Sequence, residues 1–264
     1  MKRASALLLA AATLLGAQSA AHAQAPAPRP APAAESPSDA QIRKWVEEHP
    51  DLIIQALNKY VAEQRRKEQA EGDKATLALS GEILDATSAP YVGKADAKVT
   101  VAYVLDAECG YCKQMTPLLE EFLAKNPDVR IVHRWVKYLS PSSEYAGRAS
   151  ALVWKRYPAA YHAFYREVMG HKGRLGEDGV DKALDKAVGA EAALQLRAEI
   201  RTGASREEIG EAVTAATNLA HRAGIQGTPT FVVSGLGSEG VLRGAQQPDA
   251  LQVAIDKARG ARRP

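Results

Sequence analysis

Cys109-Gly110-Tyr111-Cys112 contains both cysteines of the 264-residue chain. An apolar run typical of a β-strand, 99–105, precedes this tetrapeptide, and a helical pattern over 113–125 follows it. Two cysteines three positions apart at a strand-to-helix junction can close a small disulfide. A thiol there also lies near free backbone N–H groups, which favour the thiolate. We therefore expect the rest of the chain to build this site or to present it to a partner.

The first 23 residues have the pattern of a secretory signal peptide. Lys2 and Arg3 form a basic start, and residues 7–17 form an apolar core that is too short to span a bilayer. Ala21-His22-Ala23 is a small-x-small cleavage site. No second apolar run of about 18 residues follows in the sequence. The pattern predicts export rather than a membrane anchor.

Charge and cysteine content restrict the classes of function. The formal net charge is +3, and loss of Lys2 and Arg3 with the leader would bring it to about +1. Such a balance gives no reason to expect a nucleic-acid or anionic-membrane partner. Disulfides persist in exported proteins, yet a chain of this length can hold its fold by a hydrophobic core without them. We therefore interpret the two cysteines as reactive residues rather than as a structural disulfide.

The N-terminal part of the chain predicts a linker and two helices. Residues 24–37 are rich in alanine and proline, which is typical of a flexible linker. One amphipathic helix ends near Glu48, and a second runs from about 51 to 70 with Ile53 and Tyr60 on its apolar face. So short a segment cannot bury this face alone. It can fold back onto the main domain or pair with another copy of the chain, and we favour an oligomerisation segment over residues 38–75.

From about residue 76 to 264 the composition is that of an α/β domain. The patterns predict an edge strand at 82–85, a turn over 91–98 and a fully buried strand at 99–105. With the helix at 113–125, which Pro117 should kink, and a strand at 129–136, they form a right-handed βαβ unit.

A long helical region follows this unit. Helical patterns without strand signals occupy about 140–226, at 144–156, 159–169, 180–188, 190–200 and 205–224. One helix would suffice for a crossover, so this length predicts an inserted helical subdomain. Strands at 230–234 and 239–243 then predict a hairpin, before a last helix over 248–259.

Three features together resemble the thioredoxin superfamily. These are the Cys-x-x-Cys at a strand–helix junction, Pro117 inside the next helix, and Gly227-Thr228-Pro229 before the penultimate strand. The helical insertion is similar to that of the DsbA-like periplasmic branch. The N-terminal helices resemble the oligomerisation segment of ScsC-type proteins, which are copper-tolerance-associated disulfide isomerases. The resemblance covers about 83–258 and implies a thioredoxin fold (βαβ…ββα) with a large helical insertion, in the periplasm.

The resemblance also implies roles for particular residues. Pro229 would be a cis-proline beside the dithiol, and Thr228 would present its backbone to an extended substrate. Cys109 would be the exposed nucleophile and Cys112 the more buried resolving cysteine, so that Cys109–Cys112 forms a redox-active disulfide.

The direction of exchange depends on the surroundings of the pair. Gly110 keeps the turn permissive, Tyr111 can lie against a substrate, and both should tune the pair. Gly-Tyr between the cysteines and Thr228 before the proline resemble DsbC-type isomerases rather than DsbA-type oxidases. Asp106 and Glu108 flank the pair, and their charge should disfavour a thiolate and make the pair less oxidising.

The sequence thus predicts a periplasmic thiol–disulfide oxidoreductase that acts as an isomerase or reductase. Its expected partners are misfolded secreted proteins, a membrane thiol reductant or oxidant, and one or two further copies of the chain. A DsbA-type oxidase and a copper-binding thiol protein remain alternatives. Two cysteines are too few for a zinc site, and the histidines are scattered. We therefore expect neither a metal nor a cofactor: His133, His162, His171 and His221 are interpreted as surface or packing residues.

Overall fold

The computed structural model describes residues 37–209, 211–246 and 248–261. The predicted signal peptide and linker residues 24–36 lie outside this range. The chain divides into two compact units, Met1–Leu57 and Asn58–Pro264. Helix α1 (Pro37–Glu48) belongs to the first unit, and helix α2 (Pro50–Ala78) begins in the first and ends in the second. Within the described ranges, no helix is both long and apolar enough to cross a membrane.

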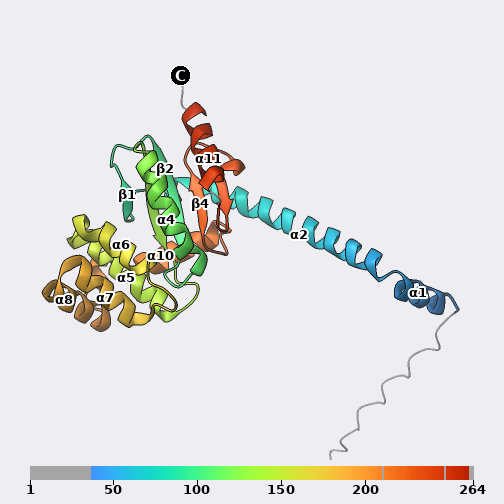
Figure 1. Cartoon of the computed structure of the whole chain (residues 1–264), viewed down its shortest axis with the longest axis horizontal. Coiled ribbons are helices and arrows are strands. Elements are labelled where there is room, and N and C mark those ends of the chain that lie inside the picture. The colour runs from blue at the N-terminus through green and yellow to red at the C-terminus, as the bar shows by residue number, and fades with distance from the viewer. Residues whose placement is uncertain (1–36, 210, 247, 262–264) are drawn as a thin grey trace, which may run out of the picture. The chain divides into compact units, whose positions relative to one another are not determined.

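The second unit contains a five-stranded mixed sheet with the strand order β1-β3-β2-β4-β5 (Figure 1). Strands β2 and β3 are parallel, and the other neighbouring pairs are antiparallel. The strands are β1 (Tyr91–Gly93), β2 (Val99–Leu105), β3 (Val129–Trp135), β4 (Thr230–Val233) and β5 (Val241–Arg243). The predicted βαβ unit and terminal hairpin are both present.

Helices cover both faces of this sheet and fill the long connection between β3 and β4. Helices α5 to α8 gather beside one end of the sheet (Figure 1). The predicted helical insertion is therefore confirmed. The α-helices of the second unit after α2 are α3 (Ser80–Leu84), α4 (Gly110–Lys125), α5 (Pro141–Arg156), α6 (Tyr161–Met169), α7 (Gly176–Val188), α8 (Ala190–Thr202), α9 (Arg206–Ile209), α10 (Ala212–Arg222) and α11 (Pro248–Ala261).

The side chains of the central strand β2 contribute to two hydrophobic cores, one on each face of the sheet. Every residue of β2 is buried, as its continuous apolar run predicts. Val101, Tyr103 and Leu105 face one core, which they share with α4, α11 and the helical insertion. Ala102 and Val104 face a second core with α3 and α10. The alternation along one strand therefore fixes α4 on one face of the sheet.

Two local predictions are wrong. Residues 82–85 were expected to form an edge strand, but α3 includes residues 82–84. The Arg134 side chain donates hydrogen bonds to the carbonyl oxygens of Ile83 (2.8 Å) and Asp85 (2.8 Å). These bonds pair carbonyl groups that the C-terminal end of the short helix would otherwise leave without a donor. The turn expected over 91–98 begins instead with β1, in which the buried Val92 pairs with Ile131. Both segments are short, and their structure is decided by partners on β3.

The predicted helix over 205–224 is interrupted, giving α9 and α10. The helix predicted over 113–125 begins earlier, at Gly110, and continues through Pro117 to Lys125. The second N-terminal helix is longer than predicted, because α2 extends to Ala78 instead of ending near residue 70.

The last turns of α2 are fastened to the loop that precedes β4. The Thr76 side chain is fully buried, and its hydroxyl donates to the Ala223 carbonyl (2.7 Å). The Arg243 guanidinium donates to the carboxylate of Asp73 (2.9 Å) and to the carbonyl of Gly224 (3.2 Å). Gly224 has a φ of +66°, and a Cβ there would lie 2.7 Å from the α2 backbone. This end of α2 therefore packs as part of the second unit.

Candidate functional site

The sheet register brings the two cysteines and the Thr228–Pro229 dipeptide together. Val104, one residue before the end of β2, pairs with Thr230 at the start of β4. The segment that follows β2 and the segment that precedes β4 therefore meet at one edge of the sheet. The peptide bond between Thr228 and Pro229 is cis, the geometry that the resemblance implies.

Cys109 is the N-cap of α4 and faces the loop before β4. Its Sγ accepts the backbone N–H of Cys112 at 3.4 Å, and its thiol donates to the Thr228 carbonyl oxygen at 3.4 Å. The residue is only 6% exposed, so the expectation of an exposed nucleophile is wrong. The reason is geometric, because the capping side chain turns toward the first turn of its own helix rather than toward solvent.

The two thiols are in opposite electrostatic situations. The pKa of Cys109 is lowered to about 6, first by a hydrogen bond from the Cys112 thiol. Burial opposes this shift, and hydrogen bonds from the Thr228 side chain and from the backbone N–H groups of Cys112 and Tyr111 add to it. The pKa of Cys112 is raised, first by burial and then by the neighbouring Cys109. At neutral pH the arrangement favours a Cys109 thiolate beside a protonated Cys112.

Asp106 is a structural anchor between β2 and the cysteines. Its carboxylate is buried and accepts hydrogen bonds from the backbone N–H groups of Glu108 (2.8 Å), Tyr138 (2.9 Å) and Leu139 (3.1 Å), as well as from the Ser143 hydroxyl (2.6 Å). The Tyr138, Leu139 and Ser143 donors come from the loop after β3 and the start of α5. The carboxylate therefore fixes the loop before Cys109 against the helical insertion.

Glu108 fastens the same loop to a different part of the insertion. Its carboxylate accepts from the backbone N–H groups of Leu175 (2.9 Å) and Gly176 (3.0 Å) and from the Ser142 hydroxyl. Burial opposes ionisation, but these hydrogen bonds outweigh it and the pKa of Glu108 is lowered. The two acids were expected to disfavour a Cys109 thiolate, yet the pKa of Cys109 is lowered. N–H and O–H donors bind both carboxylates, and the separate effect of the acids on the thiolate stays a prediction.

The residues between the cysteines face solvent. Tyr111 is 62% exposed, and a Cβ placed on Gly110 would meet no atom within 4 Å. Their tuning role remains a prediction.

Three side chains that the sequence analysis did not single out form a hydrogen-bond network at the Cys112 carbonyl oxygen. The hydroxyls of Tyr103 and Thr116 both donate to the Cys112 carbonyl oxygen, each at 3.2 Å, and Thr116 also contacts the Tyr165 hydroxyl at 3.3 Å. Tyr103 is the one aromatic residue of a largely apolar strand, and this was the only sequence signal for the three supporting side chains. His133 is fully buried against Tyr161, and burial lowers its pKa to about 3, so it is neutral.

The chain is similar in sequence to known proteins. Residues 85–257 match the family described as Thioredoxin. The chain belongs to the thioredoxin family. This thioredoxin-family chain is 24% identical over 173 residues to disulfide bond formation protein D of Bacillus subtilis, a match that covers 64% of the chain and 76% of the relative.

Two solved structures are similar over most of the chain. Salmonella enterica Typhimurium BcfH has a TM-score of 0.68 at 25% identity, covering 84% of this thioredoxin-family chain and 95% of BcfH. Proteus mirabilis ScsC in a transitional conformation has a TM-score of 0.60 at 22% identity, covering 86% of this chain and 98% of ScsC. These likenesses confirm the thioredoxin fold and the predicted resemblance to DsbA-like proteins of the ScsC type.

The titration of Cys109 gives a direct test of this geometry. We expect its thiolate absorbance in the ultraviolet to rise with a midpoint near pH 6, well below the midpoint of roughly 8.5 for a free cysteine. Because the folded-state pKa is lowered, the reduced protein gains stability over the unfolded chain as the pH rises from about 6 to about 8.5. It loses this contribution as the pH falls through about 6.

The Cys112→Ala variant separates the causes of this shift. It removes the donor that lowers the pKa of Cys109 most, so the midpoint should move upward, and Cys109→Ala provides the blank. An unchanged midpoint in Cys112→Ala would show that Cys112 does not stabilise the thiolate.

Proposed function

We propose that this chain is a periplasmic thiol–disulfide oxidoreductase that exchanges disulfides with protein substrates through Cys109 and Cys112, acting as an isomerase or reductase. One observation carries the proposal: a thiol with a lowered pKa lies 3.4 Å from the Thr228 carbonyl, with a buried, protonated second thiol one helical turn behind it. Membership of the thioredoxin family and the likeness to a disulfide bond formation protein support it.

The first step is attack by the Cys109 thiolate on a substrate disulfide. A bond forms between Cys109 Sγ and one substrate sulfur while the substrate S–S bond breaks, and the second sulfur leaves with the electron pair as a thiolate. In isomerisation, a substrate thiolate then attacks the substrate sulfur of this mixed disulfide. A new substrate disulfide forms, the Cys109 thiolate is restored, and there is no net oxidation.

Reduction takes a different second step. Cys112 loses its proton and attacks Cys109 Sγ, so that the Cys109–Cys112 disulfide forms and the remaining substrate sulfur leaves as a thiolate. The substrate has gained two electrons and the pair has lost two. A membrane thiol reductant is the partner we propose for returning the pair to the dithiol.

A groove beside the Thr228–Pro229 bond could hold an extended substrate segment. It has a volume of about 720 Å³, and it lies between the loop before β4 and one face of α2. The part of α2 that lines it belongs to the second unit and includes Arg65, Glu68 and Gly72. Helix α2 would therefore form one wall of the substrate site.

Self-association is the second element of the proposal. On α1, Ile42 is 63% exposed and Trp45 47%; on α2, Ile54 and Leu57 are each 57% exposed and Tyr60 is 60%. Large apolar side chains gathered on one segment in this way mark an interaction surface. Pairing with further copies of α1 and α2 would cover them, and several active sites around one client suit isomerisation.

Reactivation of a scrambled-disulfide protein tests the proposed activity. The wild-type chain should accelerate recovery of native disulfides in the presence of a thiol buffer, because the Cys109 thiolate opens wrong bonds. The Cys109→Ala variant is the matched control, since it removes the attacking sulfur. Recovery no faster than with Cys109→Ala would remove the isomerase claim.

A dithiol oxidase is the second candidate, favoured by the lowered pKa of Cys109. A value of about 6 lies between roughly 7 for thioredoxin and roughly 3.5 for DsbA. A stabilised thiolate favours the reduced pair and so makes the disulfide more oxidising. Acid trapping of the protein from cells distinguishes the two, because an oxidase accumulates with Cys109 and Cys112 oxidised and an isomerase with both reduced.

A further inference from the structure

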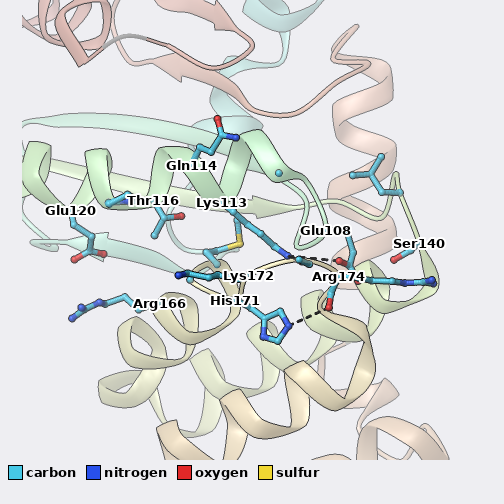
Figure 2. Close-up of a pocket in the computed structure, with 16 residues that line it drawn as sticks. Glu108, Lys113, Gln114, Thr116, Glu120, Ser140, Arg166, His171, Lys172 and Arg174 are labelled. Carbon is cyan, nitrogen blue, oxygen red and sulfur yellow. Dashed lines mark hydrogen bonds and ion pairs between the residues drawn. The ribbon is translucent and has the colours of Figure 1, made fainter.

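A second cavity opens beside the cysteine pair, and neither Thr228 nor Pro229 lines it. It has a volume of about 1090 Å³ and lies between the first turns of α4 and the loop that joins α6 to α7 (Figure 2). Glu108 and Gly110, the neighbours of Cys109 in the chain, both line it, so the cavity borders the reactive residue. Part of its wall is apolar, formed by Pro117, Leu139 and Met169.

Besides Lys113, three cations line this cavity. Arg166 lies on α6, and Lys172 and Arg174 lie on the loop that follows, all with exposed side chains (Figure 2). In the part of the chain that the structure describes, no ion pair joins any of the three to an acidic group. The sequence analysis did not single out these residues, although Lys172 and Arg174 lie in a short basic run, His171-Lys172-Gly173-Arg174.

The two acids in the lining are already engaged. Glu108 holds the backbone of Leu175 and Gly176 and lies 3.8 Å from Lys113 Nζ. Glu120 Oε1 lies 2.7 Å from His162 Nε2. The carboxylates therefore do not neutralise Arg166, Lys172 and Arg174, and the cavity carries a net positive charge beside the thiol.

We propose that this cavity binds an acidic segment of the client protein next to the cysteine that exchanges with Cys109. The inference rests on the proposed function and gives it a substrate class. The positive charge of the cavity favours an acidic occupant. Leu139 in the apolar wall is 57% exposed and can contact the aliphatic parts of the occupant's side chains. The volume suits several residues of a chain rather than a single small ion.

The test uses three labelled peptides that are identical except for the residues flanking their one cysteine: aspartate, serine or lysine. Each is supplied as its homodimeric disulfide, so that attack on either sulfur gives the same products. Cys109 becomes joined to one peptide as the symmetric S–S bond breaks, and the other peptide leaves as a thiolate. Rates are divided by those with dithiothreitol, which corrects for the intrinsic reactivity of each disulfide.

We expect the full chain to prefer the aspartate peptide over the serine peptide by about tenfold at low ionic strength, with a smaller preference in high salt. The triple variant Arg166→Gln, Lys172→Gln, Arg174→Gln should bring the ratio close to one. The control Lys125→Gln, Lys182→Gln, Lys257→Gln removes the same charge from exposed positions outside the cavity and should keep the wild-type ratio. Circular dichroism establishes that both variants are folded.

The outcomes separate the two proposals. Equal, Cys109-dependent rates for all three peptides would overturn the acidic-segment proposal and leave the exchange activity intact. The same loss of preference in both triple variants would also overturn it, because net charge rather than the cavity would then be responsible. Rates no higher than those of Cys109→Ala for every peptide would instead remove the proposed function itself.

Discussion

The Cys112→Ser variant should accumulate a covalent adduct with its substrate, joined through Cys109. Cys112 is fully buried and its pKa is raised, so its sulfur is held next to Cys109 and is shielded from other partners. Only an intramolecular thiol gains the large effective concentration of such a position. Without it the mixed disulfide must wait for an external thiol, and we expect its lifetime to rise by about a hundredfold or more.

Intact-mass measurement under non-reducing conditions detects this adduct. Serine is the suitable replacement because it preserves the size and polarity of the buried side chain. The Cys109→Ser variant is the control and should show no adduct, since Cys112 has neither access nor a reactive thiolate. Equal adduct formation by the two variants would mean that the assignment of attacking and resolving cysteines is wrong.

The sequence predicts most of the fold because its strongest patterns are local. The nearly continuous apolar run of β2 predicts burial on both faces, which places it in the centre of the sheet. Cys109 and Cys112 follow this strand closely, and Pro229 directly precedes β4. They meet because β2 ends at the edge of the sheet where the antiparallel β4 begins. The long helical stretch after β3 likewise exceeds what a crossover needs.

The features that the sequence does not predict depend on contacts between distant segments. Asp106 and Glu108 look like repelling charges beside a thiol, but donors from α5 and from residues 175 and 176 make them anchors. Residues 82–84 become helical because Arg134 on β3 binds the helix end. The burial of Cys109 follows from its capping geometry and the Thr228 contact, neither of which can be derived from spacing alone.

Charging the exposed apolar face of α2 should convert an oligomer into single chains. Ile54→Lys with Leu57→Lys in the full chain should lower the mass per particle from two or three chains to one. Each apolar side chain buried in an interface contributes about 2 kcal/mol, and an unpaired lysine buried there adds a desolvation cost. Light scattering coupled to size-exclusion chromatography measures the mass directly.

The matched control places the same charges on other exposed apolar residues. Leu194 on α8 is 64% exposed and Val253 on α11 is 55% exposed, so Leu194→Lys with Val253→Lys changes net charge and surface hydrophobicity to a similar degree. This control should keep the wild-type mass. If the wild-type chain is a single particle, or if both double variants keep its mass, α2 does not mediate association. If only the α2 variant dissociates, its reactivation of scrambled protein should fall while its exchange with small peptides persists, because the first needs several sites and the second needs only Cys109.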